Sequence, residues 1–356
     1  MAKVIVGMSG GVDSAVAAYL LKQQGYEVIG VTLRTWQSDT GEDSRCCEID
    51  DARAIARQIG IPYYAFNCLR DFDEKIVQPF INGYINGVTP NPCVLCNREI
   101  KWARLEYYAK VLEADYIATG HYAFIKRLDS GRYTVKMAEH EGKDQAYMLY
   151  RLTQDQLKNT LMPLGSLSKD EVRDIAKKAG ITVADKPDSQ DICFITDGNY
   201  TDFIQTHATA PLPGEGNFVD EDGNILGKHK GIIYYTVGQR KGLGIALGAP
   251  AYIKKIDPAK NEIVLCRADD TNCSALICKD LNFMSIKPPN KGEKFECTVK
   301  VRYRHAGQTA TVEALGEDRV KITFTSPVRY AAPGQSAVFY DRDGCVIGGG
   351  IIAEIL

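Results

Sequence analysis

The stretch Val4–Leu21, VIVGMSGGVDSAVAAYLL, decides the fold of the N-terminal half. Lys3–Val6 is a β-branched run of the kind found in buried parallel strands. Glycines follow between Gly7 and Gly11, where the backbone must turn sharply, and Val12–Leu20 then repeats apolar residues at helical spacing. A helix that begins behind a glycine turn points unpaired backbone amides at a ligand beside it. The stretch therefore predicts a strand, a turn and a helix with a site suited to phosphate.

The turn Ser9–Ser14, SGGVDS, resembles the SGGxDS loop of the PP-loop ATP pyrophosphatases. It is not a Walker A loop, because GxxxxGK[ST] does not occur in the sequence. The resemblance implies cleavage of ATP between the α and β phosphates, with adenylation of a substrate oxygen. The alternative is an ordinary tight turn between a strand and a helix.

Composition describes an ordinary globular chain of 356 residues, of which 45% are hydrophobic and 25% charged. This length suggests two to three domains. The formal charge of −2 means that any nucleic-acid partner must be held by a local basic surface. No apolar run approaches the ~20 residues that span a bilayer, and the N-terminus predicts no secretory signal, so we expect a cytoplasmic protein without a membrane partner. Eleven cysteines then indicate thiols, metal ligands or catalysis rather than a disulfide scaffold.

Strands alternate with helices through the first half of the chain. We expect further strands at 27–33, 62–66 and 116–119 and helices at 50–59, 71–84, 100–112 and 169–179. This alternation predicts βαβ units and a doubly wound parallel sheet. The resemblance of the SGGVDS turn implies that this sheet is of the adenine nucleotide α-hydrolase-like, PP-loop kind. Ligands bind such sheets at the carboxyl ends of the strands, so Ser9, Leu33 and Gly120 are expected to converge on one nucleotide. The alternative for Leu33 is a role in the core only.

The sequence pattern changes after Thr209, where predicted short strands separated by Gly, Asp and Asn replace the helical periodicity. Gly231–Gly248 indicates a strand, a turn and a strand, and further strands are expected at 297–303, 308–314, 320–324 and 336–340. The predicted fold is therefore α/β followed by two small mainly β domains, the last a β-barrel. The expected domains are a PP-loop catalytic domain at 1–205, a central β-rich domain at 206–272 and a C-terminal β-barrel at 273–356.

Two cysteine motifs carry the remaining chemistry. Asn91–Asn97, NPCVLCN, is expected in a loop between two helices, and Asp188–Phe194, DSQDICF, in a loop after the last helix of the first half. A lone CxxC fits a zinc knuckle or a redox pair, and a single cysteine is often a small buried hydrophobe. If ATP activates a carbonyl oxygen, however, a nearby thiolate or persulfide can attack the activated carbon and replace oxygen with sulfur.

The whole chain resembles the bacterial tRNA-specific 2-thiouridylases. The motifs that carry this resemblance are GMSGGVDS at Gly7–Ser14, NPCVLCNREIKW at Asn91–Trp102, ATGHYA at Ala118–Ala123, KDQAYML at Lys143–Leu149, DSQDICFI at Asp188–Ile195, YTVGQRKGLGI at Tyr235–Ile245, VRYRH at Val301–His305 and PGQSAVFY at Pro333–Tyr340. The first motif alone indicates only the superfamily. The two cysteine motifs in this order, with GQRKGLG, RYR and PGQS, are specific to the family.

The resemblance implies 2-thiolation of uridine 34 in tRNA(Glu), tRNA(Gln) and tRNA(Lys), with ATP and Mg²⁺ as cofactors and a cysteine desulfurase or relay protein as sulfur donor. ATP would adenylate the uracil O2, and sulfur would displace AMP; a monomer is expected. Cys193 matches the cysteine that carries the persulfide, and Cys96 the nucleophile that forms a redox disulfide with it. ATP contacts would be Gly7, Met8, Ser9, Gly10, Gly11, Val12, Asp13, Ser14, Leu33 and Gly120. Contacts to the target base would be Asn91, Pro92 and Cys93, and contacts to tRNA His121, Lys143, Asp144, Gln145, Arg302, Tyr303 and Gln335.

Each transferred role has a plainer alternative. Lys143 and Arg302 can neutralise phosphates or simply be solvated, and Tyr303 can stack on a base or pack in the core from a strand. His121 can be a structural histidine. Gln145, Asn91 and Gln335 can form hydrogen bonds with base edges or cap turns. Asp13 and Asp144 can hold Mg²⁺ or orient Lys143.

Two other functions also fit the PP-loop. One is a ligase of the argininosuccinate-synthetase type, which needs no cysteine, and the other is a non-catalytic, nucleotide-gated RNA-binding protein. Pyrophosphate release and a dependence on cysteine separate these from a thiolase.

Cys93 departs from the family pattern, because many relatives carry Asp at this position. Cys93, Cys96 and Cys193 could together hold a [4Fe–4S] cluster with one open iron, or zinc, whereas the alternative is a spare or resolving thiol at Cys93. Cys46 and Cys47 are interpreted as bystanders. The GQRKGLG turn at 238–244 is expected to be a basic hinge or a hairpin without a catalytic role.

Overall fold

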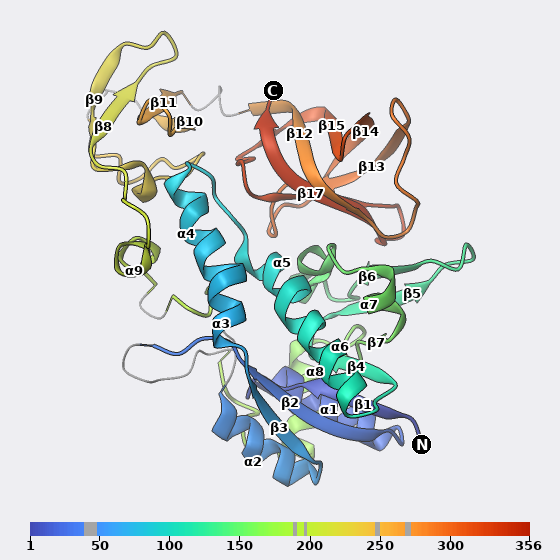
Figure 1. The fold of residues 1–356 in the computed structure, drawn as a ribbon. Helices are drawn as coiled ribbons and strands as arrows, with labels where there is room; N and C mark the ends of the chain where they lie inside the picture. The colour runs from blue at the N-terminus through green and yellow to red at the C-terminus, as the bar shows by residue number, and fades with distance from the viewer. Residues whose placement is uncertain (39–47, 188–190, 196–197, 246–249, 268–271) are drawn as a thin grey trace.

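A computed structural model describes residues 1–38, 48–187, 191–195, 198–245, 250–267 and 272–356. Cys46, Cys47 and the segment 188–190 of the second cysteine motif lie outside the described residues. Figure 1 shows an α/β unit that holds the N-terminus, a small β unit, and a barrel that holds the C-terminus. No helix in the described part of the chain is long and apolar enough to cross a membrane.

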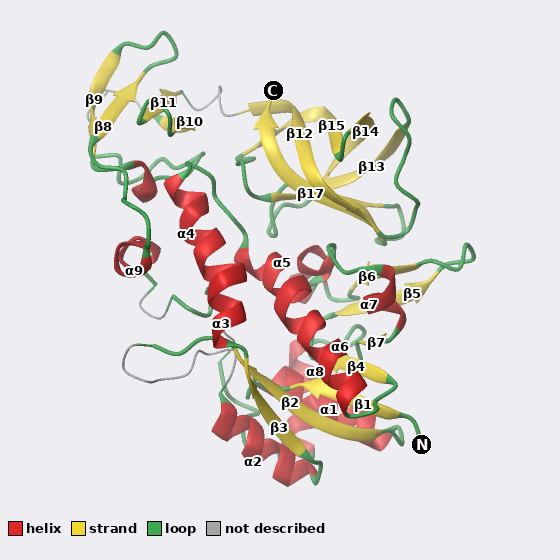
Figure 2. Ribbon diagram, in the orientation of Figure 1, coloured by secondary structure: helices red, strands yellow, loops and turns green. Residues whose placement is uncertain are grey.

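A parallel sheet forms the centre of the α/β unit (Figure 2). Its strand order is β3-β2-β1-β4-β7, and each neighbouring pair runs parallel. The strands are β1 (Lys3–Gly7), β2 (Glu27–Arg34), β3 (Tyr63–Asn67), β4 (Tyr116–Thr119) and β7 (Thr160–Leu161). The expected parallel sheet is confirmed, and the short strand β7 is an addition to it.

Both faces of this sheet are covered, as the uninterrupted apolar strand β1 predicts. Val4 and Val6 point into a core shared with α1 (Val12–Gln23), α2 (Ile49–Ile59) and α8 (Lys169–Lys178). Ile5, one residue out of phase, points to the opposite core with Trp102 and Leu105. Because successive strand side chains alternate between faces, these two cores establish the doubly wound arrangement.

Two long helices of this unit each contain a π-helical turn. The first joins α3 (Leu69–Phe72) to α4 (Gln78–Ile85), and the second joins α5 (Pro92–Cys96) to α6 (Ala103–Val111) through residues 97–102. The prediction that Asn91–Asn97 is a loop is therefore wrong. Asn91 caps α5 by accepting a bond from the Val94 amide at 3.4 Å, and Pro92 suits the first helical position.

Several elements were not expected from the sequence. They are the hairpin β5 (Ala123–Arg127) and β6 (Tyr133–Met137), the short helix α7 (Gln154–Lys158), and α9 (Tyr200–His207). The central unit has the sheet order β10-β11-β8-β9, formed by Tyr252–Asp257, Glu262–Cys266, Gly216–Val219 and Ile225–His229. The strand–turn–strand prediction for Gly231–Gly248 is wrong over its described residues, where a short 3₁₀ turn precedes turns at three positive-φ glycines, Gly238, Gly242 and Gly244.

The C-terminal strands close into a barrel, as expected. The order is β12-β15-β14-β13-β16-β17, with bounds Asn272–Phe283, Arg319–Arg329, Gln308–Gly316, Lys294–Lys300, Ser336–Tyr340 and Val346–Ile355. Strand β13 ends at Lys300, so Tyr303 lies in the following turn and not on a strand. Tyr303 is 36% exposed, which rules out the alternative that it is core packing.

The barrel is joined to the α/β unit by bonds to backbone carbonyls. Arg132 donates to the carbonyls of Met284 and Phe283, both at 2.8 Å. Tyr147, fully buried, donates to the carbonyl of Ser336 at 2.8 Å. Backbone groups buried at such a contact must be paired, so these bonds fix the barrel in one position against the α/β unit.

Gly334 provides a test of this contact. It has φ +90°, and a Cβ built on it would lie 2.4 Å from Val88 Cγ1 and 2.9 Å from the Thr89 carbonyl carbon. Gly334→Ala should cost about 1 kcal/mol for the left-handed backbone and roughly 1–3 kcal/mol more for the collision. Thermal unfolding followed by calorimetry measures the effect.

Gly344→Ala is the matched control, because Gly344 also has a positive φ, +75°, but its nearest contact is the Met137 side chain at 3.5 Å. The control should lose only the backbone contribution. Equal shifts in Tm for the two variants would contradict a tight contact at Gly334.

Candidate active site

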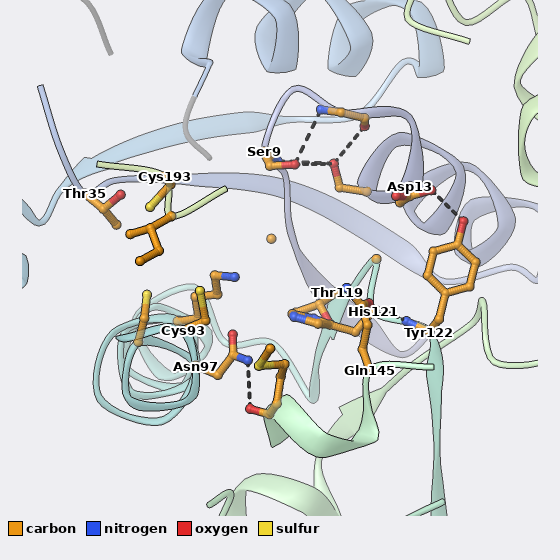
Figure 3. Close-up of a pocket in the computed structure, with 18 of the residues that line it drawn as sticks. Ser9, Asp13, Thr35, Cys93, Asn97, Thr119, His121, Tyr122, Gln145 and Cys193 are labelled. Carbon is orange, nitrogen blue, oxygen red and sulfur yellow. Dashed lines mark hydrogen bonds between the residues drawn. The ribbon is translucent and has the colours of Figure 1, made fainter. Parts of the chain in front are cut away.

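One cavity of about 810 Å³ lies at the carboxyl edge of the parallel sheet, where the α/β unit faces the barrel (Figure 3). Ser9, Leu33 and Gly120 all line it, which confirms that these strand ends converge. Figure 3 shows Cys93 and Cys193 on one side of the space, and Asp13, His121 and Gln145 on the other. The cavity therefore has a nucleotide loop, a cysteine wall and a third wall near β4.

The nucleotide loop is braced by its own serines. Ser14 Oγ accepts from the Ser9 amide at 3.2 Å and donates to the Gly11 carbonyl at 3.1 Å, and Ser9 Oγ accepts from the Gly11 amide at 3.4 Å. Gly11 caps α1 without a side-chain bond, so the first amides of the helix remain available to a ligand. Gly10 has φ +81° and faces Glu48 rather than the cavity. The loop is thus a preformed cradle for phosphate.

The two carboxylates considered for Mg²⁺ are both bonded within the protein. Asp13 accepts from Tyr122 Oη at 2.6 Å and from Lys169 Nζ at 2.7 Å. Asp144 is 6% exposed and accepts from the amides of Ala138 and Ala146 at 3.0 and 3.2 Å. Burial raises the pKa of Asp144 above its ordinary value, although the two amide bonds taken alone would lower it. Asp144 is therefore bonded as a structural residue that shapes its loop.

The cysteine wall combines a helix with a separate turn. On α5, Cys93 is exposed and Cys96 is buried. Cys193 is half-buried and belongs to the described residues 191–195. Phe194, next to Cys193, is 2% exposed and packs edge-on to Phe72 at a centroid distance of 5.7 Å. The structure records no disulfide among the cysteines it describes.

The wall near β4 carries a histidine held in its neutral form. His121 Nδ1 lies 2.9 Å from Thr119 Oγ1, and the ring lies 5.5 Å from that of Trp102. Burial, with a smaller contribution from the charge of Lys101, lowers the pKa of His121 to about 3. His121 can therefore exchange hydrogen bonds with a bound base but carries no charge near neutral pH.

The loop Lys143–Gln145 closes the cavity toward the barrel. All three residues line it, as does Tyr303, which donates to the Asp144 carbonyl at 2.9 Å. Gln145 is bonded to Tyr122 through its side-chain oxygen and its amide, both at 2.9 Å. The barrel therefore contacts the same loop for which the family resemblance implies contact with tRNA.

Four predicted residues are not among the described residues that line the cavity, namely Gly10, Asn91, Arg302 and Gln335. Asn91 caps α5, and Gln335 donates to the Thr89 carbonyl at 2.9 Å, so both are bonded as structural residues. Arg302 is exposed, with its guanidinium 5.6 Å from the centre of the Tyr330 ring. Of the other predicted residues, Pro92, Cys96 and most of the SGGVDS loop line the cavity.

Sequence reasoning missed several polar residues that line the cavity. They are Asn97, Lys101, Tyr122, Lys186, Lys300 and Arg304. Lys101 and Asn97 lie within the motif NPCVLCNREIKW, and Arg304 within VRYRH, so both motifs held the signal. Lys186 precedes the second cysteine motif and pairs with Glu48 and Asp51, a contact that no local pattern indicates.

The low pKa of His121 gives a test of the site. His121 should stay neutral from pH 8 down to pH 5, and its ring resonance should not titrate in that interval, because its pKa is about 3 against an ordinary 6.5. Below pH 6.5 the unfolded chain binds a proton that the folded chain does not. The contribution of this residue to stability therefore falls as the pH drops from 6.5 toward 3. NMR of ¹³C-histidine protein, with the resonance identified by its absence in His121→Gln, measures this; titration near pH 6.5 would contradict it.

Comparison with known proteins identifies the family. The family model described as the tRNA methyl transferase HUP domain matches residues 2–197, the tRNA methyl transferase PRC-barrel domain matches 201–267, and the aminomethyltransferase beta-barrel domain matches 273–352. A solved structure of the U34-tRNA thiolase NcsA from Methanococcus maripaludis with its [4Fe-4S] cluster is similar at a TM-score of 0.36 and 20% identity. It covers 58% of this chain and 67% of its own, a likeness too low to support any inference.

Curated relatives are much more similar. The tRNA-specific 2-thiouridylase MnmA of Lachnoclostridium phytofermentans is 49% identical over 99% of this chain and 100% of its own length. The protein of the same name from Clostridioides difficile is 49% identical over 99% of both chains. With the motifs, the fold and full-length similarity in agreement, the chain belongs to the tRNA-specific 2-thiouridylase family.

Proposed function

We propose that this enzyme converts uridine 34 of tRNA(Glu), tRNA(Gln) and tRNA(Lys) to 2-thiouridine. One observation carries the proposal: a single cavity is lined by the SGGVDS loop, by Cys96 and Cys193, and by the loop Lys143–Gln145. A phosphate cradle, two thiols and a base-facing wall are the groups that ATP-dependent thiolation requires. Uridine 34 lies in the anticodon loop, so extruding it into the cavity costs only a few kcal/mol.

The first step is adenylation of the uracil. The amides at the start of α1 bind the phosphates of ATP, with Leu33 and Gly120 beside the nucleotide. The uracil O2 attacks the α-phosphorus, the bond to the β-phosphate oxygen breaks, and pyrophosphate leaves. Pro92 and Cys93, at the start of α5, lie beside the base, together with the neutral His121.

The second step replaces oxygen with sulfur. A persulfide on Cys193 is attacked by the Cys96 thiolate, which forms a Cys96–Cys193 disulfide and releases hydrosulfide. Hydrosulfide attacks C2 of the adenylated uracil, the C2–O bond breaks, and AMP leaves. The sulfane sulfur is thereby reduced, the two thiols are oxidised, and a cellular thiol reductant must reopen the disulfide before the next cycle.

Mg²⁺ is proposed to arrive with ATP. Mg²⁺ in nucleotide sites is held by one or two carboxylates and by the phosphates of the substrate. Asp13 is an acidic residue within the cradle, but its carboxylate already accepts bonds from Lys169 and Tyr122. The phosphates are therefore expected to supply most of the ligands, and a bound ion would neutralise charge on the leaving pyrophosphate.

A [4Fe–4S] cluster does not fit the arrangement of the cysteines. Such a cluster needs thiolates that converge on one point. The described residues contain no group of three or more His, Cys, Asp or Glu side chains placed to hold a metal. Cys93 is also exposed, whereas Cys96 is buried. We therefore assign Cys93 to the wall beside the base and derive no step from a cluster.

We also propose the partner and the location of the enzyme. The sulfur donor is a cysteine desulfurase or a relay protein that loads Cys193. Because its substrate is tRNA, the enzyme is expected in the cytoplasm, where it acts as a monomer.

The proposed domains are a catalytic unit at 1–205, a central β unit at 206–272 and a tRNA-binding barrel at 273–356. His121, Lys143, Gln145, Arg302 and Tyr303 are the proposed tRNA contacts. The turn at 238–244 has no catalytic role.

Substitution of the two cysteines tests the mechanism. Cys96→Ala and Cys193→Ala should lower 2-thiouridine formation by about 10³-fold or more, because each removes a group that the sulfur transfer needs. Both variants should still release pyrophosphate when ATP and unmodified tRNA are present, since adenylation precedes sulfur transfer. Mass spectrometry of digested tRNA measures the oxygen-to-sulfur exchange.

Cys266→Ala is the matched control, because Cys266 and Cys96 are both 8% exposed and Cys266 does not line the cavity. Cys93→Ala should keep full thiolation, and the wild type should retain no iron after anaerobic reconstitution with iron and sulfide. Full thiolation by Cys96→Ala would contradict the relay. No pyrophosphate release by the wild type with ATP and tRNA would favour a non-catalytic binding protein.

Arg302 tests the contact between the barrel and tRNA. Arg302→Ala should weaken tRNA binding and reduce the salt dependence of the binding constant by about one phosphate contact, because an exposed guanidinium pairs with phosphate and releases a counterion. Titration of tRNA binding at several salt concentrations measures this. Arg319→Ala, which removes an exposed arginine paired with Glu354 at 2.7 Å, should leave the slope unchanged. An unaltered slope in Arg302→Ala would make Arg302 a structural residue.

A further inference from the structure

Asp13 joins three segments that are distant in the sequence. It lies in the first turn of α1, accepts from Tyr122 Oη at 2.6 Å, and accepts from Lys169 Nζ at 2.7 and 2.9 Å. The Lys169 side chain, at the start of α8, is only 10% exposed. Charge-assisted bonds in such partly buried surroundings are stronger than surface ion pairs. The lysine also neutralises a carboxylate that would otherwise repel phosphate beside the cradle.

Tyr122 is bonded on both sides. Its hydroxyl reaches Asp13 in the nucleotide loop, as Figure 3 shows, while its backbone is bonded to Gln145. The Tyr122 amide donates to Gln145 Oε1 at 2.9 Å, and the Gln145 amide donates to the Tyr122 carbonyl at 2.9 Å. Tyr122 itself is 2% exposed, so it cannot move without displacing both partners.

The barrel extends this connection. Tyr303 donates to the carbonyl of Asp144, the residue before Gln145, at 2.9 Å. A continuous set of bonds therefore runs from the barrel through Gln145 and Tyr122 to Asp13. Gly120 lies against the same point, since a Cβ there would be 2.6 Å from the Ser14 amide nitrogen. The segment that carries Tyr122 thus has no space to shift against α1.

We propose that Tyr122 is a positioning residue that couples tRNA binding to ATP binding. This rests on the proposed function, in which Gln145 and Tyr303 contact tRNA. A tRNA that contacts Gln145 and Tyr303 favours the position of the loop Lys143–Gln145 in which Tyr122 is held against Asp13. The same position keeps the amides at the start of α1 in the arrangement that binds ATP. The coupling is reciprocal, so ATP tightens tRNA binding by the same factor.

The experiment measures that factor directly. The dissociation constant of a non-hydrolysable α,β-methylene ATP analogue is determined by calorimetry with and without saturating unmodified tRNA(Glu) transcript. Wild type should bind the analogue about 10-fold more tightly with tRNA, within the usual range of coupling between two sites. In Tyr122→Phe, which removes only the hydroxyl, the factor should fall below about 2-fold.

Tyr63→Phe is the matched control. The Tyr63 hydroxyl, in the same α/β unit, donates to Thr32 Oγ1 at 2.8 Å and lies 3.3 Å from the Ile49 carbonyl oxygen. It should keep the wild-type coupling factor. Gln145→Ala cuts the connection from the other side, so it should weaken tRNA binding and also lower the factor.

Each outcome decides the proposal. Absence of coupling in the wild type, full coupling in Tyr122→Phe, or full coupling in Gln145→Ala would overturn it. A loss of coupling equal to that of Tyr122→Phe in the Tyr63→Phe control would also overturn it, because any lost hydroxyl would then suffice. Thiolation of the same transcript by the wild type is assayed in parallel. No thiolation refutes the proposed function, whereas thiolation without coupling refutes only this inference.

Discussion

The close approach of Gly120 to the first turn of α1 is the constraint on which the site depends. A Cβ on Gly120 would lie 2.6 Å from the Ser14 amide nitrogen and 2.7 Å from the Asp13 carbonyl carbon, so only glycine permits this packing. Two neighbouring parallel strands, β1 and β4, deliver the two segments to the same edge of the sheet. With the segments in contact, Tyr122 can reach Asp13, and His121 can face the space in front of the cradle.

The residues of the site come from loops, a helix and turns, because phosphate binding and sulfur transfer need different kinds of groups. Phosphate binding needs backbone amides held in place, and a braced loop at a helix N-terminus supplies them. The two thiols instead come from a helix turn and from a separate turn, an arrangement that leaves one of them half-buried. Phe194 keeps the second turn attached through its packing with Phe72, so Cys193 lies beside a buried anchor.

The barrel completes the cavity instead of standing beside it. Lys300, Tyr303 and Arg304 line the same space as the nucleotide loop, although about 290 residues separate them from that loop in the sequence. Buried bonds such as that from Tyr147 to the Ser336 carbonyl fix their position. Because an unpaired buried carbonyl costs free energy, the contact has a defined geometry, and the barrel can offer cations to a nucleic acid without rearrangement.

From the sequence it was possible to predict the parallel sheet, the glycine turn before α1 and the terminal barrel, because each depends on local periodicity or on a contiguous motif. The sequence could not determine that Asn91–Asn97 begins a helix, since a proline and an asparagine suit both a loop and a helix start. Nor could it show that the side chain of Gln335, which the family resemblance assigns to tRNA, donates to the Thr89 carbonyl. The pairing of Asp13 with Lys169 and Tyr122 was decided only by the tertiary structure. The reason is physical: 156 residues separate Asp13 from Lys169, and only the packing of α1 against α8 and β4 brings their charges together.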